Sequence, residues 1–256
     1  MYESLAKDST KQLLIDAGLA TPKTYDLFSS EQVLAESQRK RSDSELLLYG
    51  PIVSDAMRSY VVEMGIPAIS PLWLNSELKK VKGDNLLLRI NSPGGSWFQG
   101  SAMLSALEHD GRTVNTYVDG IAASFASVIT LFGAKVGMGE MSGLFVHRPI
   151  TATAGYADNL RADADVLDQL EKQAMQFYGK RFKGQDVAAL MRGTDGEGTH
   201  ITAQQALESE MIDYVGAKSA PAKTDQTDAA MSRQRDAFRM AITSYQLSKG
   251  DLNVNA

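Results

Sequence analysis

Short apolar runs alternate with longer amphipathic stretches through the middle of this chain. The runs are rich in Leu, Val and Ile and end at glycine, proline or small polar residues; they read ELLLYGPIV, NLLLRINS, TVNTYVDG and KVGMGEMSGLFVHRP. Buried strands of parallel sheets have near-continuous apolar runs of this kind. Because helical stretches separate the runs, the pattern predicts an α/β layer fold with parallel strands.

The stretches between these runs predict helices. WFQGSAMLSALEHDG indicates a helix that ends at Gly111, and IAASFASVITLFG indicates a helix of small residues directly after a strand. Residues 156–182 predict one long helix, with leucines near helical spacing on one face and acidic residues on the other. A last helix of the domain is expected from about Ala203, followed by a short apolar segment.

The two ends of the chain differ from this middle part. Residues 1–43 hold two short helical patterns with few apolar positions and predict an N-terminal helical arm, whereas residues 44–216 carry the alternating pattern of one domain. Residues 217–228, AKSAPAKTDQTD, are small, polar and charged, which is typical of a linker. Residues 229–256 predict a C-terminal helical tail.

Composition excludes several functions. The chain has 256 residues and a net charge of −5, which disfavours a nucleic-acid-binding protein with a broad basic face. It has no cysteine, which excludes disulfides, zinc–thiolate centres and cysteine nucleophiles. No secretory signal is visible, and no stretch reaches about 18 apolar residues. We therefore expect a cytoplasmic protein that binds neither a membrane nor nucleic acid.

Two stretches that follow apolar runs carry residues suited to nucleophilic catalysis. Residues 91–96 read NSPGGS, and paired glycines let backbone N–H groups face a ligand. Ser124, in DGIAASFAS, is expected in the first turn of its helix, where the N–H of Phe125 is free to bind an oxyanion. The simpler interpretations are a strand-to-helix turn and a small serine at a helix contact. Ser127, one turn further on, is expected to be packed.

A general base and its partner are also present. His147 ends the run LFVHRP, and a histidine at the end of a strand suits proton transfer because its ordinary pKa lies near neutrality. Asp195 and Glu197, in the glycine-rich RGTDGEGTH, are candidate acids to orient that histidine, although a solvated acidic turn is the alternative. Three scattered histidines without HExxH do not make a metal site, so we expect no metal cofactor.

Taken in this order, these pieces resemble the Clp-type serine peptidases, especially the Clp-like head-maturation (prohead) proteases of tailed phages. The likeness rests on INSPGG, AAS and H-x-P as a set and runs from about Glu45 to Val215. It implies the repeated β-β-α layers of the Clp and crotonase folds, with residues 156–182 as a protruding handle helix through which copies form a homo-oligomer. It also implies a polypeptide substrate bound as an added strand.

The resemblance assigns roles position by position. Ser124 matches the nucleophile and His147 the general base, while Gly95 and Phe125 match the residues whose backbone N–H groups form the oxyanion hole. The match implies acyl transfer to Ser124, and neither a metal nor a nucleotide cofactor.

The acid is where this chain departs from the family pattern. The family's acid position falls on Gly198. A one-residue insertion would restore Glu197, which we prefer to Asp195, and if neither reaches His147 a Ser–His dyad remains.

The resemblance implies a serine endopeptidase that processes phage capsid or scaffold proteins during head maturation, in the host cytoplasm or inside the prohead. Three alternatives remain open. A Ser–Lys protease of signal-peptide-peptidase type would not need FVHRP. A crotonase-like acyl-CoA enzyme would share the glycine-rich turns but would not combine them with this serine and histidine. A catalytically decayed, scaffold-associated protein would explain the displaced acid.

Overall fold

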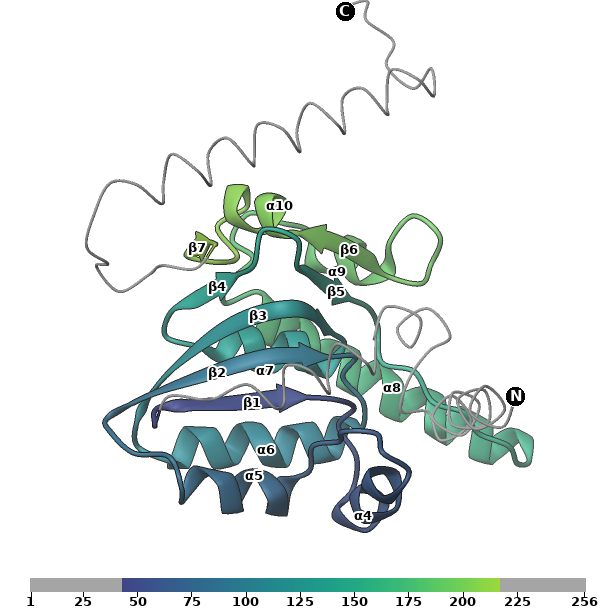
Figure 1. Ribbon diagram of the computed structural model, residues 1–256. Helices are drawn as coiled ribbons and strands as arrows, with labels where there is room; N and C mark the ends of the chain where they lie inside the picture. Colours follow the sequence, from purple (N-terminus) through teal and green to yellow (C-terminus); the bar gives the residue numbers. More distant parts are fainter. Residues whose placement is uncertain (1–42, 217–256) are drawn as a thin grey trace, which may run out of the picture. The chain divides into compact units, whose positions relative to one another are not determined.

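The structure is a computed structural model that describes residues 43–216. The predicted linker and C-terminal tail, and the predicted N-terminal arm up to residue 42, lie outside the described residues. The described part is built on a seven-stranded sheet with helices packed against it (Figure 1). This arrangement confirms the predicted α/β fold.

Most of the sheet is parallel. Its main path runs β1-β2-β3-β4-β7, with these strands at Glu45–Tyr49, Asn85–Ser92, Thr113–Ala123, Val136–Met138 and Tyr214–Val215. The remaining two strands are β5 (Gly143–Val146), which is parallel to β3, and β6 (Thr199–Thr202), which is antiparallel to β5. Because β3 is 11 residues long, it pairs with β4 along its middle and with β5 at its end.

The helices bury the apolar positions of these strands. Along β2, Leu86, Leu88 and Ile90 are fully buried at alternate positions and join one core cluster with Met103 and Leu107 of α6. Figure 1 shows α5 and α6 against one face of the sheet, beside β1 and β2. The helices of the described part are α4 (Asp55–Glu63), α5 (Pro71–Leu78), α6 (Trp97–His109), α7 (Phe125–Phe132), α8 (Ala157–Tyr178), α9 (Val187–Arg192) and α10 (Ala203–Glu208).

One boundary differs from the sequence prediction. The stretch IAASFASVITLFG was expected to be entirely helical, but β3 continues through Ala123 and α7 begins only at Phe125. Ile121, Ala122 and Ala123 pair with β5 and are buried, so sheet pairing overrides the helix propensity of the alanines. Ser124 therefore lies in the turn between strand and helix, not in the first turn of the helix.

The predicted long helix is present as α8. Its C-terminal end is anchored in the core by Ala174 and Tyr178. By contrast Tyr156, just before the helix, and Leu160 and Val166, in its N-terminal half, are 87%, 41% and 44% exposed. Figure 1 shows α8 projecting beyond the sheet. Between residues 43 and 216, no helix has both the length and the apolar character needed to cross a bilayer.

Candidate active site

Ser124 occupies the turn between β3 and α7. Its backbone has φ 52° and ψ −132°, a conformation that residues with a Cβ rarely adopt and that surrounding contacts must hold in place. Its N–H donates to the carbonyl oxygen of Phe145 at 2.8 Å, and its own carbonyl accepts from the N–H of Ser127 at 2.9 Å. The strained turn places a half-buried serine at the carboxyl edge of the sheet.

The two glycines after β2, Gly94 and Gly95, let their own turn pack against the turn at Ser124 and against the segment at Ile52. A Cβ on Gly94 would lie 2.7 Å from the Cβ of Ser124 and 2.5 Å from the carbonyl oxygen of Ala123. A Cβ on Gly95 would lie 2.2 Å from the carbonyl oxygen of Ile52. Both glycines also have positive φ, 84° and 145°. Glycine is therefore needed at both positions for backbone to pack on backbone.

The same turn leaves the N–H of Gly95 outside its hydrogen bonds to Ile52. Gly95 forms a parallel bridge with Ile52, in which the Ile52 N–H donates to the Gly94 carbonyl at 2.7 Å and the Ser96 N–H donates to the Ile52 carbonyl at 3.0 Å. The residue between the Gly94 carbonyl and the Ser96 N–H is Gly95. In a parallel bridge the N–H of that middle residue points away from the partner strand. The N–H of Gly95 therefore faces away from Ile52.

Phe125 supplies a second N–H beside this glycine turn. It is the first residue of α7, so its N–H has no partner within the helix. A Cβ on Gly94 would lie 3.0 Å from this nitrogen. The ring of Phe125 is buried, packs edge-on against Trp97 and leaves no room for a side chain at Gly100. The ring thus fixes the start of α7, which sequence reasoning did not anticipate.

Two further residues of NSPGGS brace the site and were missed as functional candidates. The side-chain oxygen of Asn91 accepts from the N–H of Ile121 at 3.2 Å, across from β2 to β3. The hydroxyl of Ser92 donates to the Gly50 carbonyl at 2.7 Å and accepts from the N–H of Gly94 at 3.1 Å. Both are buried, and a buried polar side chain after an apolar run is the signal that could have identified them.

His147 directly follows β5 and lies at the same edge of the sheet as Ser124. The parallel register pairs Ala123 with Phe145, so the residues after β3 and β5 emerge as neighbours. Burial lowers the pKa of His147, and a hydrogen bond to the backbone carbonyl of Arg148 opposes this shift. His109, by contrast, lies exposed at the end of α6.

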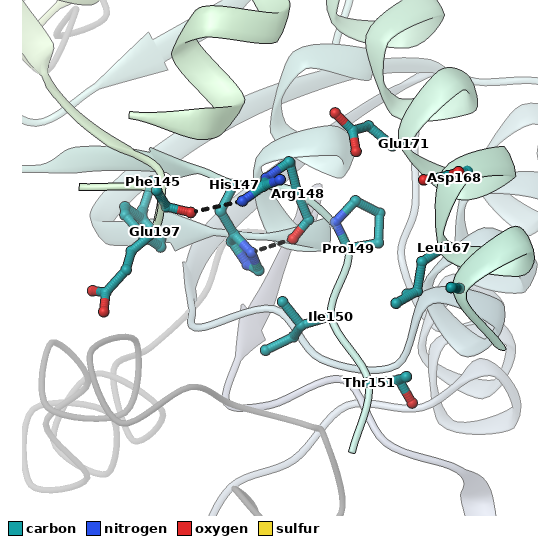
Figure 2. A pocket seen from close by; sticks show the side chains of 12 residues that line it. Phe145, His147, Arg148, Pro149, Ile150, Thr151, Leu167, Asp168, Glu171 and Glu197 are labelled. Atoms are coloured by element: carbon teal, nitrogen blue, oxygen red, sulfur yellow. Dashed lines mark hydrogen bonds between the residues drawn. The ribbon is translucent and has the colours of Figure 1, made fainter. Parts of the chain in front are cut away.

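The imidazole of His147 is oriented by the main chain. Its Nδ1 lies 2.6 Å from the carbonyl oxygen of Arg148 (Figure 2). A carbonyl only accepts hydrogen bonds, so Nδ1 carries the proton and Nε2 is the basic nitrogen. The guanidinium of Arg148 in turn donates to the Gly196 carbonyl at 3.1 Å, which ties this segment to the loop before β6.

The candidate acids, Asp195 and Glu197, lie in that loop. Gly198 packs directly on the histidine, since a Cβ there would lie 2.6 Å from the Cβ of His147 and 2.5 Å from the Val146 carbonyl oxygen. Glu197 is exposed, and its side chain points away from the imidazole in Figure 2. The carboxylate of Asp195 accepts the N–H of Glu197 at 3.0 Å.

A pocket of about 630 Å³ opens beside His147, between its segment and α8. Apolar atoms of Phe145, Pro149, Ile150 and Leu167 form much of its wall (Figure 2). Pockets that bind small organic ligands have this size and apolar character. Within residues 43–216, no three His, Asp or Glu side chains gather in an arrangement that could hold a metal ion.

Ser124 and His147 thus follow neighbouring parallel strands at one edge of the sheet. A model of the family described as Clp protease matches residues 69–219, more than half of the chain, so the chain belongs to the Clp protease family. It is 27% identical over 176 residues to the ATP-dependent Clp protease proteolytic subunit 1 of Prochlorococcus marinus, covering 64% of this chain and 87% of the relative.

Two other relatives have closely similar names. The ATP-dependent Clp protease proteolytic subunit of Ligilactobacillus salivarius is 25% identical over 195 residues, covering 75% of this chain and 88% of the relative. Subunit 2 of Parasynechococcus marenigrum is 29% identical over 166 residues, covering 64% of this chain and 78% of the relative. Family and relatives together identify the protein as a Clp-type serine peptidase.

The close approach of Gly94 to Ser124 predicts a sharp difference between two glycine substitutions. Gly94→Ala should lower peptidase activity about a hundredfold, because its Cβ must displace the turn at Ser124. Gly65→Ala is the matched control, since Gly65 has a similar φ of 79° but open space around its Cβ. It should cost about 1 kcal/mol of unfolding free energy and leave activity unchanged. Peptidase assays and urea unfolding of both variants test this, and equal activity losses would contradict it.

Proposed function

We propose that the protein is an endopeptidase in which Ser124 is the nucleophile and His147 the general base. The observation that carries this proposal is the meeting of three turns at one edge of the sheet. The glycine turn after β2, the strained turn after β3 and the segment after β5 follow parallel neighbouring strands. Parallel strands bring their carboxyl ends to the same edge, which is where α/β enzymes bind ligands.

The reaction is acyl transfer in two halves. Nε2 of His147 takes the hydroxyl proton of Ser124 as the serine oxygen attacks a peptide carbonyl. The N–H groups of Gly95 and Phe125 stabilise the oxyanion, and removing one such donor typically costs about 3–4 kcal/mol. His147 then protonates the leaving amine, which gives an ester on Ser124. In the second half His147 activates a water molecule, which releases the acid and restores the serine.

The proposed base works without a carboxylate partner. The carbonyl of Arg148 holds the Nδ1 proton of His147, and this is the orienting function that the acid has in a Ser–His–acid triad. Gly198 stands where the family pattern has its acid, and its contact with the histidine backbone leaves no room there for a longer side chain. This favours a Ser–His dyad over a triad in which Glu197 or Asp195 is the third member.

The biological role is proposed on the likeness of the motifs. The set INSPGG, AAS and H-x-P is similar to that of phage head-maturation proteases, so we propose capsid or scaffold polypeptides as substrates. An extended substrate strand would lie along the site, with a side chain in the pocket beside His147. We propose α8 as the element through which copies associate, because apolar side chains in its N-terminal half are exposed.

Processing of a co-expressed substrate tests this function. The wild type, expressed with the capsid and scaffold genes that neighbour its own, should shorten one of their products, as measured by intact-protein mass spectrometry. Ser124→Ala and His147→Gln should each abolish the cleavage. The matched controls are Ser76→Ala and His109→Gln, which change an exposed serine on α5 and an exposed histidine on α6. Processing by Ser124→Ala at the wild-type level would refute the peptidase proposal.

The dyad predicts a characteristic dependence of kcat/KM on pH. The neutral form of His147 is the active base, so activity should fall as acid protonates it. Because burial lowers its pKa, the midpoint should lie below the ordinary value of about 6.5. Glu197→Gln and Asp195→Asn should keep this midpoint and retain kcat/KM within about twofold. A loss of several thousandfold in either variant would instead identify that residue as the acid of a triad.

A further inference from the structure

A chain of hydroxyl groups connects the C-terminal end of α8 to the turn at Ser124. The hydroxyl oxygen of Ser127 lies 2.6 Å from the carbonyl oxygen of Ser124. It also lies 2.7 Å from the hydroxyl oxygen of Tyr178, the last residue of α8. Ser127 is 0% exposed and Tyr178 is 2% exposed, so water does not compete for these bonds.

The direction of each hydrogen bond follows from counting protons. The carbonyl of Ser124 can only accept, so the single hydroxyl proton of Ser127 points to it. Tyr178 must then be the donor to Ser127. Burial raises the pKa of Tyr178 to about 12, although the hydrogen bond to Ser127 opposes the shift, so the tyrosine remains a neutral donor at physiological pH.

These contacts go beyond the common packing of a small polar residue in a helix. Serine and threonine often bond back to the preceding turn, as Thr130 does in the same helix, where its hydroxyl donates to the Ala126 carbonyl at 2.9 Å. Ser127 differs because a residue 51 positions away in the chain completes its hydrogen bonding. Moreover, its backbone N–H donates to the same Ser124 carbonyl at 2.9 Å.

The target of these bonds is the residue with the strained backbone. Ser124 has φ 52°, and such a conformation persists only where several contacts determine it together. Its N–H is held by the carbonyl of Phe145, and its carbonyl is held by both donors of Ser127. A rotation of this peptide group would swing the N–H of Phe125, which is bonded to the same carbonyl carbon, away from the proposed oxyanion position.

We propose that Ser127 and Tyr178 are positioning residues for the reaction: they fix the peptide between Ser124 and Phe125 and so couple the C-terminal end of α8 to the reactivity of the nucleophile. This proposal rests on the proposed function, because it requires Ser124 to be the nucleophile. Neither residue touches the substrate, so their loss should lower kcat and leave KM unchanged.

The test measures the rate of covalent labelling of Ser124 by a fluorophosphonate, together with kcat, KM and the melting temperature. Ser127→Ala and Tyr178→Phe should each slow labelling and lower kcat about three- to tenfold, the range expected for one lost hydrogen bond. The matched control is Thr130→Val, which removes a buried back-bond of the same kind from the same helix. This variant should be labelled at the wild-type rate even if it lowers the melting temperature as much as Ser127→Ala does.

The double variant, with both Ser127→Ala and Tyr178→Phe, distinguishes an effect of Tyr178 that acts through Ser127 from two independent effects. If Tyr178 acts only through Ser127, Tyr178→Phe should add nothing to the loss that Ser127→Ala already causes. Should Ser127→Ala fail to fold, Tyr178→Phe decides alone, because it keeps the ring that stacks on Phe182. Labelling at the wild-type rate in both single variants, or slowing by Thr130→Val to the same extent, would overturn the proposal. A wild type that is not labelled at Ser124 would instead refute the proposed function.

Discussion

Contact of backbone with backbone at the carboxyl edge of the sheet is the constraint on which this site depends. Gly94 lies against the strained turn at Ser124, and Gly95 lies against Ile52, each at a distance that no Cβ could tolerate. The parallel register of β2, β3 and β5 brings these turns together, and the buried ring of Phe125 fixes the helix that follows. The proposed nucleophile is thus held chiefly by its neighbours' main chain.

Much of this arrangement could be predicted from the sequence. Apolar runs located the strands, and α8 falls within the range that its helical pattern indicated. Ser124, His147 and the paired glycines were all singled out, because each follows an apolar run where a strand ends. The predicted boundary between β3 and α7 was wrong, because local propensity cannot show that the alanines before Ser124 pair with a distant strand.

The rest could not be predicted because it depends on contacts across the chain. The bond between Ser127 and Tyr178 spans 51 positions, and nothing in either local sequence indicates it. The orientation of His147 depends on a carbonyl, which every residue has and which therefore leaves no trace in a sequence. The motif placed the family's acid at Gly198, and only the structure shows that glycine packed against the histidine backbone.

The central claim is that the N–H groups of Gly95 and Phe125 face the position of the substrate's carbonyl oxygen beside Ser124 and stabilise the negative charge that forms on it. A crystal structure of the fluorophosphonate adduct tests this most directly. The account predicts phosphorus bonded to the Ser124 oxygen, with one phosphonyl oxygen about 3 Å from both backbone nitrogens. An adduct on another residue, or a phosphonyl oxygen directed to solvent, would contradict it.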